Sequence, residues 1–220
     1  NTDWSWAALF ADYDNDGWKD LLITNGNLRD FTNMDFVRYM GDHLKRIEGQ
    51  VKREAVLDLV YQMPSSNMKN YLYKNNQDLT FTNLADQWGL SEISNSGGAV
   101  YADLDNDGDL DLVINNINKP AFIYQNEGNH KLKNNYLKVE LLGQRKNTLG
   151  LGAKVTIYQG GKIQYLEQMP TRGYQSSVSP LLHFGLGQTT EIDSLEIIWL
   201  GGKSQKVMKP KVNQQLKLSE

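Results

Sequence analysis

Residues 12–20 read Asp-Tyr-Asp-Asn-Asp-Gly-Trp-Lys-Asp, and residues 103–111 read Asp-Leu-Asp-Asn-Asp-Gly-Asp-Leu-Asp. Both stretches have carboxylates at positions 1, 3, 5 and 9 and a glycine at position 6. Alternate side chains converge on one point only where the backbone coils tightly, and glycine permits that turn. Oxygen ligands suit a hard divalent cation, and Ca²⁺ tolerates a flexible shell of many oxygens. The repeat therefore predicts two Ca²⁺-binding loops.

The predicted ligands are the side chains at positions 1, 3, 5 and 9 and the backbone carbonyl at position 7. They are Asp12, Asp14, Asp16, Trp18 and Asp20 in the first loop, and Asp103, Asp105, Asp107, Asp109 and Asp111 in the second. An EF-hand is excluded, because its position 12 needs a glutamate and both loops have isoleucine there. The alternative is a pair of Asp- and Asn-rich turns without metal. Carboxylates that repel one another favour the metal site.

Each loop lies between two short apolar runs that are rich in strand-forming residues. Leu9-Phe10-Ala11 and Leu21-Leu22-Ile23 flank the first loop, and Val100-Tyr101-Ala102 and Leu112-Val113-Ile114 flank the second. This arrangement predicts a strand–loop–strand unit that is used twice.

Composition limits the class of protein. The chain has 220 residues, 40% of them hydrophobic, with a net charge of −3 and no cysteine. Lysine and arginine are scattered, so we expect no nucleic-acid partner, and no stretch is long and apolar enough to span a membrane. Without disulfides, the chain is compatible with a bacterial envelope protein. It begins inside the first repeat, and we interpret it as a piece of a longer precursor.

Residues 33–62 change to helical periodicity and form a predicted insertion between the two repeats. Phe36, Val37, Met40, Leu44 and Ile47 recur at three- and four-residue steps, with Asn33 as the expected N-cap. After Gly49 a second amphipathic run continues to Pro64. Two roles remain open: helices that cover a sheet edge, or a helix pair that binds a partner.

The remaining sequence predicts β-structure in two domains. Residues 70–127 read as one four-stranded antiparallel blade, and we place a domain boundary between residues 131 and 132. Six alternating runs follow, with glycine pairs at Gly160-Gly161 and Gly201-Gly202 where hairpins need positive φ. The expected fold class is mainly β: antiparallel propeller-type blades with a helical insertion (1–131), and a small sandwich or jelly-roll-like domain (132–220).

Both parts resemble known families. Phe10 to Leu22 and Tyr101 to Val113 resemble FG-GAP (VCBS-type) repeats, the blades of integrin α-subunit propellers and of many bacterial secreted proteins. The C-terminal part is similar to the ASPIC/UnbV domain at Asn135-Tyr136-Leu137, Gly150 to Ala153, Gly173 to Ser176, Leu182 to Gly187 and Asp193 to Lys203. The resemblance implies a Ca²⁺-binding propeller followed by an ASPIC/UnbV module on secreted or surface proteins.

Residues 1–131 supply about two blades, whereas a closed propeller needs at least about four. Two explanations are open. The chain is the C-terminal end of a larger propeller, or its unpaired edges associate with another chain.

No enzyme motif is present in the sequence. None of the histidines (His43, His130 and His183) lies in a catalytic pattern, and His183 is expected to be structural. Trp4 and Trp6 would share a strand face, and Trp18 lies in the first loop, so these rings either hold a sugar or pack between blades. We therefore expect a binding module for a protein or glycan. The alternatives are part of a polysaccharide-processing enzyme, or a structural cap.

Overall fold

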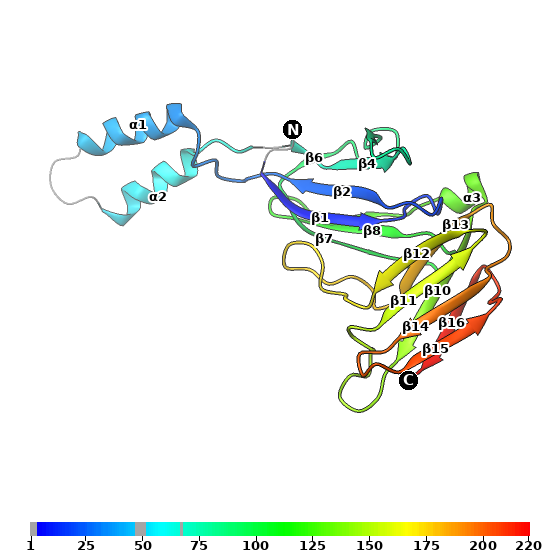
Figure 1. Ribbon diagram of the computed structural model, residues 1–220. Helices are drawn as coiled ribbons and strands as arrows, with labels where there is room; N and C mark the ends of the chain where they lie inside the picture. The colour runs from blue at the N-terminus through cyan, green and yellow to red at the C-terminus, as the bar shows by residue number, and fades with distance from the viewer. Residues whose placement is uncertain (1–3, 47–51, 67) are drawn as a thin grey trace.

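The computed structural model describes residues 4–46, 52–66 and 68–220. The described chain is mainly β, and its strands form several small sheets (Figure 1). The fold class predicted from the sequence is confirmed in this respect. No helix in the described ranges is long and apolar enough to cross a membrane.

The first blade is a four-stranded antiparallel sheet. Its strands are β1 (Ser5–Ala11), β2 (Asp20–Asn25), β4 (Tyr71–Asn75) and β5 (Phe81–Asn83), in that order. The prediction that residues 70–127 form one blade is wrong, because β4 pairs with β2 through Leu72 opposite Leu22. The helical insertion separates the second and third strands of this blade in sequence, and these strands still pair with each other in one sheet.

The second blade repeats the first without the insertion. It contains β7 (Ser96–Ala102), β8 (Asp111–Asn116) and β9 (Phe122–Tyr124). A short antiparallel pair joins β3 (Met68–Lys69), which precedes β4 in sequence, to β6 (Ile93–Ser94), which precedes β7. Both blades contribute to one buried cluster, which includes Leu9, Leu22, Leu72, Leu112 and Ile114.

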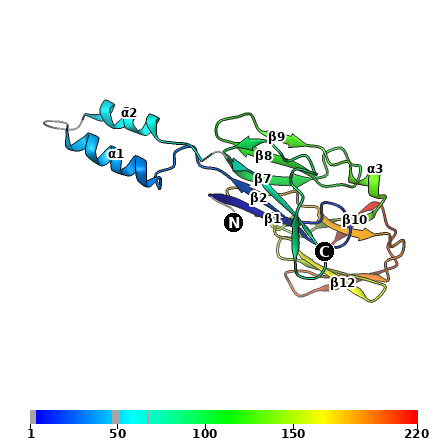
Figure 2. The ribbon, with the colours of Figure 1, turned by 90° about the horizontal axis from the view of Figure 1, so that it is seen from above.

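The helical insertion projects away from the sheets (Figures 1 and 2). It consists of α1 (Met34–Lys45) and α2 (Arg53–Gln62). The predicted cap is confirmed, because the Asn33 side chain accepts a hydrogen bond from the Phe36 amide. Helix α1 has no buried residue and α2 buries only Leu59, so of the two roles left open, this low burial does not favour helices that cover a sheet edge. Ile47 and Gly49 lie outside the described residues.

The C-terminal part is a two-sheet sandwich that follows a short helix, α3 (Gly128–Leu132). One sheet has the order β12-β11-β14-β15, and the other has the order β13-β10-β16. The strands are β10 (Asn135–Leu142), β11 (Lys154–Gln159), β12 (Lys162–Glu167), β13 (Leu182–Gly187), β14 (Ser194–Ile198), β15 (Ser204–Met208) and β16 (Gln214–Ser219). Their buried side chains, including Phe184, Ile197 and Trp199, form a second cluster.

Two features of this sandwich differ from the expected one. The sequence predicted six strands, and β16 is a seventh. It pairs with β10 in parallel, so this sheet is mixed rather than antiparallel. The Gly160-Gly161 hairpin agrees with the prediction, since both glycines have positive φ and Gln159 pairs with Lys162. The domain boundary at residue 131 stays a prediction.

Candidate metal centres at the domain junction

The first candidate loop closes the hairpin between β1 and β2, where Ala11 pairs with Asp20. Its backbone turns through left-handed conformations at Asn15 (φ 57°) and Gly17 (φ 93°). This coil brings ligand atoms of Asp12, Asp14 and Asp20 within 4.8 Å of one another. Three of the predicted side-chain ligands of the loop therefore converge.

The second loop has the same construction between β7 and β8, where Ala102 pairs with Asp111. Left-handed residues again occur at positions 4 and 6, at Asn106 (φ 63°) and Gly108 (φ 96°). Ligand atoms of Asp103, Asp105 and Asp111 lie within 4.8 Å of one another. Positions 1, 3 and 9 thus converge in both copies.

Position 9 joins each loop to the end of the third strand of its blade, or to the residues directly after that strand. Asp20 accepts hydrogen bonds from the Tyr13 amide at 3.1 Å and the Asn75 amide at 2.9 Å. In the second blade, Asp111 accepts them from Leu104 and Asn126, both at 2.8 Å. Two backbone amides donate to the position-9 carboxylate in each loop. The two centres therefore have equivalent supporting hydrogen bonds as well as equivalent acidic residues.

The ligands predicted at positions 5 and 7 lie outside these triads. Asp16 accepts from the Trp18 amide at 2.9 Å, and Asp107 accepts from the Asp109 amide at 2.8 Å. The Asp109 side chain is buried and accepts a hydrogen bond from Asn15 at 2.8 Å. Their roles as ligands, including the carbonyls at position 7, stay predictions.

Burial disfavours the ionised form of the carboxyl groups in the first loop. It raises the pKa of Asp12 to about 7 and that of Asp20 to about 7, and it also raises the pKa of Asp14. The neighbouring carboxylates add to the rise at Asp12. A bound cation would favour the ionised forms, so buried carboxylates of this kind fit a metal site.

Each loop also contacts a lysine that sequence reasoning missed. The Lys74 ammonium contacts Asp14 and lies 2.9 Å from Asp16, and the Lys138 ammonium lies 2.5 Å from Asp103 Oδ2. Asp103 Oδ1 is buried and accepts no hydrogen bond from the described residues. No local pattern could reveal Lys138, because β10 meets this loop only in the folded chain.

The C-terminal sandwich lies against both loops (Figure 1). Asn15 donates to the Gly108 carbonyl at 3.0 Å, and its carbonyl accepts from the Gly187 amide at 2.7 Å. The Asn15 side-chain oxygen lies 2.6 Å from Nε2 of His183, which is buried on β13. The tip of the first loop therefore touches the second loop and the sandwich at once.

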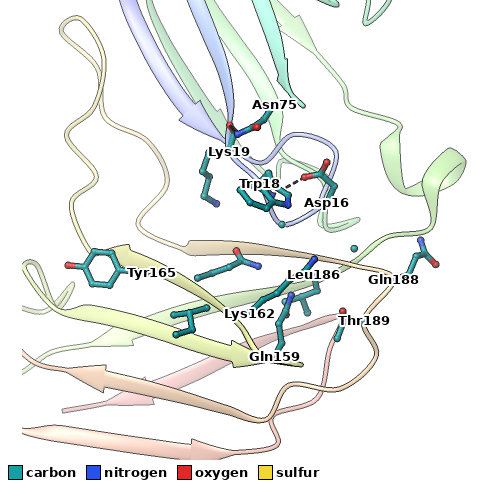
Figure 3. A pocket seen from close by; sticks show the side chains of 14 residues that line it. Asp16, Trp18, Lys19, Asn75, Gln159, Lys162, Tyr165, Leu186, Gln188 and Thr189 are labelled. Atoms are coloured by element: carbon teal, nitrogen blue, oxygen red, sulfur yellow. Dashed lines mark hydrogen bonds between the residues drawn. The ribbon is translucent and has the colours of Figure 1, made fainter. Parts of the chain in front are cut away.

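Beside this contact, an open groove of about 920 Å³ lies between one side of the first loop and β12 of the sandwich (Figure 3). Trp18 and Lys19 lie on the loop side, and Lys162 and Tyr165 lie on the β12 side. The lining also includes Asp16, two apolar side chains and five uncharged polar ones: Ile163, Leu186, Asn75, Gln159, Gln164, Gln188 and Thr189. Sequence reasoning found Trp18 but not the groove.

Trp4 and Trp6, the other two rings considered as sugar contacts, lie near the opposite end of β1. Trp4 precedes the strand with a φ of 47°, so the predicted alternation with Trp6 does not hold. Trp4 packs edge-on against Phe31, and Trp6 packs against Tyr174 and donates to the Gly26 carbonyl at 2.7 Å. Of the three rings, Trp18 alone lines the groove.

Comparison with known proteins agrees with the two-part architecture. A family model described as FG-GAP-like repeat matches residues 56–114, which include the second loop, and one described as ASPIC and UnbV matches residues 143–220. Cartilage acidic protein 1 of Mus musculus is 32% identical over 129 residues, covering 55% of this chain and 19% of the relative. The Homo sapiens protein of that name is 33% identical over 112 residues, covering 48% and 16%.

The matched regions span less than a fifth of the length of these relatives. The order of the two family matches agrees with the order of the two structural parts, blades first and sandwich second. The chain thus carries an FG-GAP-like repeat followed by an ASPIC and UnbV domain, in a β-propeller-like arrangement.

Proposed function

We propose that this chain is a Ca²⁺-stabilised binding module of a larger secreted or cell-surface protein. The observation that carries the proposal is the repeated loop, in which positions 1, 3 and 9 converge twice on matching backbone conformations. Carboxylate oxygens in a flexible loop are ligands typical of Ca²⁺. The relatives are named for cartilage, a tissue that consists largely of extracellular matrix, and this supports a location outside the cell.

The ion would have a structural role. Asp20 is held by the amides of Tyr13 and Asn75, so a cation on Asp20 links the loop to β4 as well as to β1 and β2. In the second blade the amides of Leu104 and Asn126 give Asp111 the same position. Binding to the folded state alone stabilises it by about 2 kcal/mol per site when the ion exceeds its Kd some 50-fold.

The groove beside the first loop is the proposed ligand site, and its lining favours a glycan with acidic groups. The Trp18 and Tyr165 rings are exposed and offer flat faces to sugar rings. Lys19 and Lys162 form no ion pair with any residue in the described ranges, whereas the one acidic residue of the lining, Asp16, is paired with Lys74. The net charge of the lining therefore suits an anionic ligand.

Two other functions are less well supported by the groove. Glycoside hydrolysis uses a pair of carboxyl groups, and the groove offers only Asp16, so we assign the chain no reaction. A purely structural cap would need no such groove. A protein ligand is the other outcome of the binding test.

Calcium titration by calorimetry, together with thermal unfolding in calcium and in chelator, tests the metal proposal. We expect binding with a Kd on the order of 10⁻⁵ to 10⁻³ M and a higher midpoint in calcium. An unchanged midpoint and no heat of binding would refute it.

Titration with acidic and neutral oligosaccharides, and with an acidic peptide, tests the groove. Trp18→Ala and Lys162→Ala should each weaken acidic-glycan binding about tenfold, since each removes a contact of 1 kcal/mol or more. The matched controls are Trp88→Ala and Lys203→Ala, which lie outside the groove lining. Preference for the peptide would reassign the ligand class, and equal losses in the controls would reject the site.

A further inference from the structure

The two loops differ in the lysine that each one contacts. Lys74 belongs to β4 of the same blade as the first loop, and its side chain is 29% exposed. Lys138 belongs to β10 of the sandwich, and its side chain is 6% exposed. The first ammonium can therefore move into solvent when a cation enters, whereas the second is enclosed.

Packing around Lys138 holds it on the second loop. Its ammonium lies 5.8 Å from the centre of the Tyr136 ring, and that ring stacks on His183. A Cβ on Gly108 would overlap the Tyr136 ring, so the loop and β10 approach as closely as glycine allows. Moving Lys138 off Asp103 thus requires the sandwich to separate from the loop.

Asp103 contacts Lys138 through only one of its two carboxylate oxygens. Its Oδ2 accepts from the Lys138 ammonium and from the Gly108 amide at 3.1 Å. Its Oδ1 is buried and accepts no hydrogen bond from the described residues. The side chain is 3% exposed, so the buried charge of Asp103 needs a cation beside it. That cation is either the Lys138 ammonium or an ion bound in the loop.

We propose that Lys138 is a built-in counter-cation of the second loop, so that Ca²⁺ and the docked sandwich compete for Asp103. The inference rests on the proposed calcium binding and adds that the two loops differ in calcium affinity. A divalent ion close to an enclosed ammonium is strongly repelled. The first loop is then the tighter calcium site, and calcium at the second loop opposes docking of the sandwich through Lys138.

The test uses Lys138→Met in an Asp12→Asn background, which leaves only the second loop to bind tightly. In chelator this variant should be destabilised, because Asp103 loses its partner while it stays buried. Millimolar calcium should restore most of the loss, since the ion replaces the ammonium. Calorimetry should show calcium affinity at least tenfold higher than in Asp12→Asn alone.

Lys74→Met, in an Asp103→Asn background, is the matched control for the first loop. Because Lys74 can move aside, its removal should change calcium affinity less than threefold. A further variant, Lys138→Met with Asp103→Asn and Asp12→Asn, should lose the calcium rescue, because both charges of the pair are gone.

The outcomes separate the two proposals. Calcium binding to the unsubstituted chain with no gain of affinity in Lys138→Met would overturn the counter-cation and leave the metal proposal standing. If Lys138→Met does not fold in chelator, recovery of the native circular dichroism on adding calcium supports the inference, and failure to recover at saturating calcium rejects it. No calcium binding in any variant would reject both proposals.

Discussion

His183 Nε2 lies 2.6 Å from the side-chain oxygen of Asn15, while His183 Nδ1 is buried and makes no hydrogen bond with the described residues. The Asn15 amide nitrogen donates to Gly108 and Asp109, so its oxygen is the acceptor and Nε2 carries the proton. A second proton on Nδ1 would have no acceptor. Burial, together with the charges of Lys19 and Lys138, lowers the pKa of His183 to about 3.

This neutral histidine contributes a loss of stability in acid, opposite in sign to the contributions of the buried Asp12 and Asp20 carboxyls. The unfolded histidine, with a pKa near 6.5, takes up a proton between pH 7 and pH 5, and the folded one does not. The free energy of unfolding should therefore fall by about 2 kcal/mol from this group over that range. Urea unfolding of the unsubstituted chain and of His183→Gln at both pH values measures it. The same pH dependence in His183→Gln would contradict the assignment.

Asp12→Asn should have opposite effects with and without calcium. Burial raises the pKa of Asp12 to about 7, so at pH 8 its ionised form destabilises the folded state unless a cation is bound. The variant should unfold at a higher temperature than the unsubstituted chain in chelator and at a lower one in calcium. Asp78→Asn, in an exposed turn, is the control and should show no such crossing. Parallel shifts in both conditions would argue against a metal at this loop.

Gly185→Ala should disturb the contact between the sandwich and the first loop. A Cβ at this position would overlap Asp12 Oδ2 and lie 2.6 Å from the Asn15 Cα. We expect a loss of roughly 2 kcal/mol or more of stability, because backbone must shift, together with weaker calcium binding. Gly97→Ala is the control, since a Cβ there has no neighbour within 4 Å. Unchanged stability and calcium binding in Gly185→Ala would contradict a close contact between the sandwich and the first loop.

Much of the local structure was predictable from the sequence because it depends on short-range chemistry. The two loops depend on the glycines at position 6, and the start of α1 depends on Asn33. What could not be predicted is non-local. The pairing of β2 with β4 spans the helical insertion, and the parallel β10–β16 pair joins the two ends of the sandwich.

Non-local contacts were also what the sequence could not predict at the candidate site. Alternating carboxylates marked the metal ligands, because their spacing is contained in nine residues. Lys138 and His183 reach the loops from strands that are distant in sequence, and nothing near either residue indicates its partner. Periodicity also placed Trp4 on a strand face, whereas its positive φ puts it before the strand.

The two blades connect their second and third strands in very different ways. In the second blade, residues 117–121 join β8 to β9, and in the first, residues 26–70 join β2 to β4 through the projecting helices. Yet Leu22 pairs with Leu72 just as Val113 pairs with Ile123, so both connections deliver the third strand to the same place. We therefore expect the two helices to be replaceable without loss of the blade. A fluorescent label or a foreign peptide could replace them as a reporter without disturbing the strand order beneath.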